Sequence, residues 1–166
     1  NGGGLGAAIN GPGKLVSIAF DPEGAHRIAS QALVSLSPEG FAVAPQGDLI
    51  AAVNMERTYL PDRLPYTLFS RRDRSSLSLV RFDAATGALT PIDGPVGFQG
   101  VLPEDAAFDA DGDVLAVAGF HDHNAAPKAG RVDYWRVVRK GGSIRLVPTL
   151  QRREVVRGAH DLAVIP

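Results

Sequence analysis

The chain has no cysteine, a single methionine and a single tryptophan among its 166 residues. Without cysteine it has no disulfide bond, no zinc site with thiolate ligands and no thiol nucleophile. No apolar run approaches the roughly 18 residues that a spanning helix needs, so we expect no membrane span. The net charge of −1 and the small number of aromatic residues exclude a basic or stacking surface, so we expect no nucleic-acid partner.

Glycine and proline are abundant, with 19 and 12 residues, and they fall mostly between short apolar runs, where turns need them. Several of these runs belong to a segment that occurs twice. Residues 38–54 read PEGFAVAPQGDLIAAVN, and residues 103–119 read PEDAAFDADGDVLAVAG. A truncated third copy, AHDLAVIP, occupies residues 159–166. Such repetition indicates stacked copies of one supersecondary unit.

Each full copy predicts a β-hairpin. In the first copy two apolar strands, 41–43 and 49–53, flank a turn that contains Gly47, and glycine tolerates the positive φ of such turns. A second, more polar hairpin follows at 76–92, with Gly87 in its turn. Two hairpins in succession make the four-stranded blade of a β-propeller, so the predicted fold class is all-β. Only two short segments leave a helix open as an alternative, namely residues 25–32 and 97–105.

The chain has too few blades for a ring. It divides into blade portions at 1–37, 38–102 and 103–158 and a closing strand at 159–166, all within one partial propeller domain of about three blades. Closed propellers need about four to eight blades. We therefore expect the remaining blades, or another chain, to complete the ring. In that arrangement the terminal strand, 162–165, pairs with a blade whose other strands come from elsewhere.

The pattern P-E-G-x-A-V-x-P-x-G at residues 38–47, with S-L-x-x-V-x-F-D-x-x-T-G-x-L at residues 76–89, resembles the lactonase-like, YVTN-type seven-bladed propellers. The resemblance implies the fold of the C-terminal blades of such a protein. Its members include sugar-lactone hydrolases, a muconate-lactonising enzyme and surface-layer proteins, so the fold alone does not imply one function. Calcium-dependent propeller lactonases are also similar, and Glu39 and Asn54 match positions that such enzymes use.

Three residues occupy one repeat position, just before the expected innermost strand: Glu39, Glu104 and His160. In a propeller this position lies at the mouth of the central channel, so these residues are candidate catalytic acids and bases. Together with the acidic residues that follow in two copies, they also form a candidate site for Ca²⁺ or another divalent cation, with ligands Glu39, Glu104, Asp105 and Asp161. The alternative is structural, because a carboxylate there can accept backbone N–H groups and fix a turn.

A second set of polar residues follows each inner hairpin and would line the rim of the channel. The candidate substrate-binding residues are Asn54, Glu56, Arg57, His121 and His123. The two histidines are two residues apart, so on a strand they would face the same side and could bind a metal or act as acid and base. A solvated loop for the histidines, and a local ion pair for Glu56 and Arg57, are the alternatives.

Three hypotheses about function follow. The first is a propeller scaffold or ligand-binding protein of the lactonase-like superfamily. The second is a lactonase- or esterase-type hydrolase, or an isomerase, that acts on a small polar substrate at the central channel with or without a metal. The third is a strand-sharing oligomer whose function lies in the assembly. For all three, the expected location is periplasmic or secreted, with the cytoplasm left open.

Overall fold

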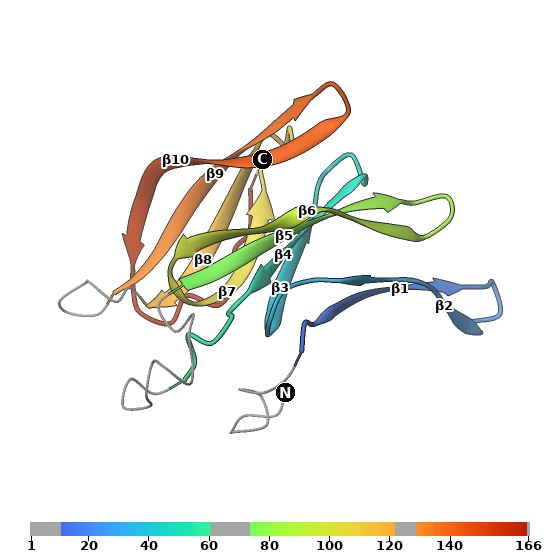
Figure 1. Cartoon of the computed structure of the whole chain (residues 1–166), viewed down its shortest axis with the longest axis horizontal. Coiled ribbons are helices and arrows are strands. Elements are labelled where there is room, and N and C mark those ends of the chain that lie inside the picture. The colour runs from blue at the N-terminus through green and yellow to red at the C-terminus, as the bar shows by residue number, and fades with distance from the viewer. Residues whose placement is uncertain (1–10, 61–73, 122–128, 166) are drawn as a thin grey trace.

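The computed structural model describes residues 11–60, 74–121 and 129–165 (Figure 1). All the secondary-structure elements in these residues are β-strands, which confirms the predicted all-β class. The strands are β1 (Lys14–Phe20), β2 (His26–Leu33), β3 (Pro38–Val43), β4 (Leu49–Asn54), β5 (Arg74–Asp83), β6 (Ala88–Gln99), β7 (Val101–Phe108), β8 (Val114–His121), β9 (Gly130–Lys140) and β10 (Ser143–Val155).

The strands form two four-stranded antiparallel sheets and one separate pair. The sheet orders are β3-β4-β5-β6 and β10-β9-β8-β7, so each sheet is two hairpins in succession, as predicted for a propeller blade. The pair β1–β2 corresponds to the outer hairpin of a preceding blade, because its Phe20-Asp21 matches Phe82-Asp83 at the end of β5. Figure 1 shows the pair and the two sheets side by side, as part of an unclosed ring.

Aspartates fix the turns that join the paired strands. The Asp109 carboxylate accepts the backbone N–H groups of Asp113 and Val114, and the Asp83 carboxylate accepts those of Ala85 and Thr86. Hydrogen bonds from the Thr86 side chain and then from the backbone N–H groups of Ala85 and Thr86 hold the pKa of Asp83 below its ordinary value. Each of these aspartates therefore has a structural role in its turn.

The core lies between the two complete sheets. Three leucines, one on each of β4, β5 and β8, are fully buried there: Leu49, Leu77 and Leu115. The rings of Phe98 and Trp135 meet edge to face, with centroids 5.7 Å apart. Burying one such leucine contributes about 1.5–3 kcal/mol, so the contact between the blades is a major source of stability.

The structure settles the two segments for which a helix was an alternative. Residues 26–33 are the strand β2, and residues 97–105 belong to β6 and β7 with only Gly100 between these strands. The predicted closing strand at 162–165 is not formed within this chain, and it stays a prediction because the blade expected to pair with it comes from elsewhere. Residues 156–165 instead run irregularly, and the Leu162 N–H donates to the Asp105 carboxylate over 3.0 Å.

In the part of the chain described here, no helix is long and apolar enough to cross a membrane.

Candidate functional site

The innermost strands of the two blades touch, and their contact places the candidate catalytic residues. A Cβ added to Gly40 of β3 would lie 2.3 Å from the Glu104 carbonyl oxygen of β7, so only glycine allows the two backbones to approach this closely. Glu39 and Glu104 are therefore neighbours across two blades. We call this end of β3 and β7 the axial mouth.

Both glutamates lie inside strands, not in turns before them as the sequence suggested. Each sits at an irregularity in the pairing: the register shifts between Pro38 and Phe41 in β3, and between Pro103 and Asp105 in β7. Proline lacks the N–H that a regular ladder needs, which is why it favours bulges. A bulge re-aims the side chains around it and is common beside active sites.

Glu104 and His160 lie close together at the axial mouth. The Glu104 Oε2 atom is 3.7 Å from His160 Nδ1, and the two side chains are 12% and 63% exposed, respectively. Burial raises the pKa of Glu104; the His160 charge lowers it and the Glu39 charge raises it further, and the net direction is upward. A largely buried carboxyl with a raised pKa beside an imidazole is an arrangement in which protons can be exchanged.

Several contacts dock the C-terminal segment, and with it His160, onto the ends of β7 and β8. The His160 ring meets the Phe120 ring edge to face at a centroid distance of 5.3 Å. The Arg157 guanidinium lies 5.5 Å from the centre of the same ring, and the Gly158 N–H donates to the Phe120 carbonyl. Together with the Leu162–Asp105 hydrogen bond, these contacts fix the position of His160 without a strand.

The predicted calcium ligands are only partly brought together. Glu39 and Glu104 are neighbours, but Asp105 is engaged by the backbone of the C-terminal segment. Among the described residues, no group of three or more His, Asp or Glu side chains is arranged to hold a metal ion. This geometry gives no support to the calcium site, whose other predicted member is Asp161.

The predicted substrate-binding residues Asn54 and Glu56 are buried. The Asn54 amide donates to the hydroxyls of Ser76 and Ser78. The Glu56 carboxylate accepts the hydroxyls of Ser35 and Ser76 over 2.5 Å each. These bonds form a framework that ties the segment between β2 and β3 to β5, and they give both residues a structural role, while their role in substrate binding stays a prediction.

The other rim candidates fare differently. Arg57 follows Glu56 and is half-buried, and His121 is buried at the end of β8. His123 lies outside the described residues. The sequence did not reveal the role of Phe120, whose ring contacts the His160 ring. Nor did it reveal the role of Ser35, whose hydroxyl donates to the Glu56 carboxylate. The run Ser75-Ser76 with Ser78, polar inside a buried strand, was the one available signal for that framework.

No family model and no curated protein sequence matches this chain. Among solved structures, it is similar to PpgL, a periplasmic gluconolactonase of Pseudomonas aeruginosa, with a TM-score of 0.58 and 22% sequence identity. The match covers 84% of this chain and 38% of PpgL. The fold is lactonase-like. At this identity the likeness shows the fold alone, and it does not single out the YVTN-type family that the repeat resembles.

The match spans 38% of the length of PpgL, so most of the PpgL fold has no counterpart in this chain. This agrees with the unclosed ring in Figure 1.

Proposed function

We propose that this chain forms part of a lactonase-like propeller that hydrolyses a small polar lactone at the axial mouth. The observation that carries the proposal is the contact of Glu104 with His160, at a bulge and beside Glu39. The similar protein PpgL is a gluconolactonase, which makes a polyhydroxylated lactone the first substrate to test. The periplasmic location of PpgL also supports a periplasmic or secreted location for this chain.

The proposed reaction assigns one proton to each group. Ionised Glu104 takes a proton from a water molecule as the water oxygen bonds to the lactone carbonyl carbon. The ring C–O bond then breaks, and protonated His160 gives its proton to the departing alkoxide. Burial of Glu104 helps, because a raised pKa makes its carboxylate a stronger base. The Glu39 carboxylate adds to that effect.

The experiment follows acid release at constant pH after a δ-lactone of a sugar acid is added to the full chain. We expect saturable acid release above the spontaneous rate. Acid release that stays proportional to lactone concentration and equals the protein-free rate would contradict the proposal.

A scaffold function is the second candidate, and one observation favours it. Asp105 and His160 at the mouth also anchor the C-terminal segment through Leu162 and Phe120. In a scaffold, these contacts would be the whole role of the mouth residues. The substitution of Glu104 considered in the Discussion distinguishes the two candidates, because a scaffold has no turnover to lose.

A further inference from the structure

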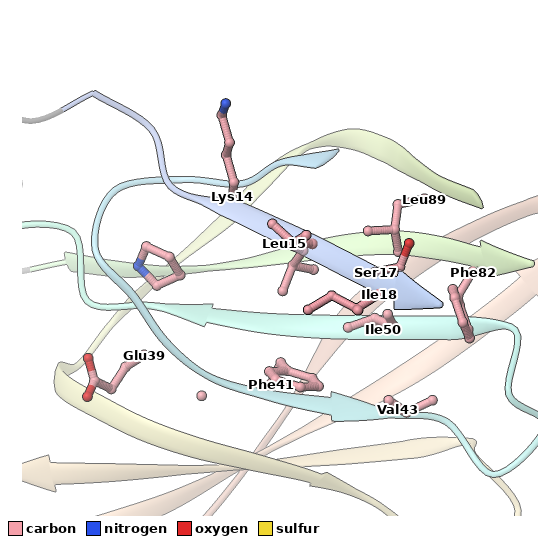
Figure 2. A pocket seen from close by; sticks show the side chains of 13 residues that line it. Lys14, Leu15, Ser17, Ile18, Glu39, Phe41, Val43, Ile50, Phe82 and Leu89 are labelled. Atoms are coloured by element: carbon pink, nitrogen blue, oxygen red, sulfur yellow. The ribbon is translucent and has the colours of Figure 1, made fainter. Parts of the chain in front are cut away.

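The outer hairpin β1–β2 lies beside a pocket of about 510 Å³ that opens between β1 and β3. Figure 2 shows Leu15 and Ile18 of β1 on one side of this pocket, Phe41 and Val43 of β3 on the other, and Ile50 of β4 between them. The lining is mostly apolar. We call this pocket the hairpin groove.

The side chains of β3 that line the groove are exposed, whereas their repeat equivalents in β7 are buried. Phe41 of β3 is 56% exposed, whereas its repeat equivalent in β7, Ala106, is 5% exposed. Val43 is likewise exposed, and its equivalent Phe108 is buried. The two blades differ in the blade that precedes each of them. Strand β7 packs against β3, the inner strand of the preceding blade, whereas the described residues before β3 include no inner strand.

The edge of β1 shows the same difference. In the complete blade, β5 pairs with β4 on one side and β6 on the other, and Val80 lies opposite Ile50. The equivalent strand β1 pairs with β2 alone within the described residues, and Ile18, which matches Val80, is 50% exposed. A strand edge with unpaired backbone groups is a template for one more strand.

We propose that the hairpin groove binds one antiparallel β-hairpin of the inner type, with its second strand paired to the free edge of β1. Three observations select this occupant over any other apolar partner. The repeat places an inner hairpin before each of the outer hairpins β5–β6 and β9–β10. The groove lies between the free edge of β1 and the exposed face of β3, so a hairpin could pair one strand with β1 and pack the other on β3. The similar protein PpgL is also much longer than this chain.

The occupant has a defined chemistry. Its second strand must be apolar on both faces, as β4 is with the sequence LIAAVN and every residue buried. Its first strand must present apolar side chains to Phe41 and Val43. Binding therefore combines backbone pairing with burial of apolar side chains, which is the strand-addition mode of recognition. The inference concerns the fold and is independent of lactone hydrolysis.

The test supplies the hairpin in the same polypeptide. A second copy of residues 38–54 is joined ahead of Asn1, so that residues 1–13 connect it to β1 as residues 55–73 connect β4 to β5. We expect exchange of the β1 amides that do not bond β2 to slow at least about tenfold, with β5 as the internal control for folding. Fluorescence of a dye that binds exposed apolar surface should fall in parallel.

Two variants make the test specific. Ile18→Asp places a charge in the groove and should abolish the slowing of exchange. Val156→Asp, at an exposed position outside the groove, should leave it intact. Unchanged β1 exchange in the joined chain would overturn the proposal. So would a dimer of the unmodified chain with β1 already protected, because a second copy would then be the occupant.

Discussion

Replacing Glu104 by glutamine is expected to slow lactone hydrolysis by about 10²–10⁴-fold, the range typical of a lost general base. Glutamine keeps the size of the side chain but cannot take the proton of the attacking water. The measurement is acid release at constant pH, with Glu23→Gln as the matched control. Glu23 is exposed in the turn between β1 and β2, away from the axial mouth, so this control should keep the wild-type rate.

The pH profile provides a second readout of the same prediction. Since the base is the ionised form, the wild-type rate should rise as pH increases through the raised pKa of Glu104, and the residual rate of Glu104→Gln should lack that rise. A raised folded-state pKa also means that the Glu104 contribution to stability falls as pH rises through it. The glutamine variant should therefore be no less stable at neutral pH, and full activity in it would refute the catalytic role of Glu104.

Removing the buried carboxylate of Glu56 is expected to have the largest effect on stability. Glu56→Ala should lower the free energy of unfolding by about 3–6 kcal/mol, because each of its two hydroxyl hydrogen bonds to a charged group contributes about 1.5–3 kcal/mol. Ser35 and Ser76 would lose their acceptor in a site that is only 2% exposed at Glu56. Urea unfolding followed by circular dichroism measures the change.

Glu56→Gln is the control for this prediction. Its amide oxygen can still accept both hydroxyls, so we expect a loss of less than half that of the alanine variant. The backbone of Glu56 has a φ of 55°, in the left-handed region, so Glu56→Gly should recover part of the loss by relieving strain. An alanine variant as stable as the wild type would show that the framework does not depend on this carboxylate.

The strands and turns of the blades could be predicted from the sequence because their signals are local. Apolar runs divided by Gly47 or Gly112 predict hairpins whatever surrounds them, and both glycines adopt the positive φ of 72° that such turns use. Repetition then identified the blade. The terminal strand at 162–165 stays a prediction, because a strand also needs a partner edge and the blade expected to supply it lies outside the described residues.

The site was predictable only in part. The repeat position of Glu39, Glu104 and His160 identified residues at the axial mouth, where Glu104 contacts His160. It did not reveal the bulges that re-aim the glutamates, because these arise from proline in a paired strand. The burial of Asn54 and Glu56 was missed because it depends on Ser35 and Ser76, which approach only after the sheets fold.

The most direct test of a site at the axial mouth is to map where a sugar-acid lactone contacts the protein. Backbone amide shifts of the ¹⁵N-labelled full chain would be recorded during titration with the lactone, and again with Glu104→Gln. We predict saturable shifts centred on Glu39–Gly40 of β3, on Glu104–Asp105 of β7 and on His160, and largely lost in the variant. Shifts confined to other surfaces, or none at saturating lactone, would contradict the assignment of this mouth as the site.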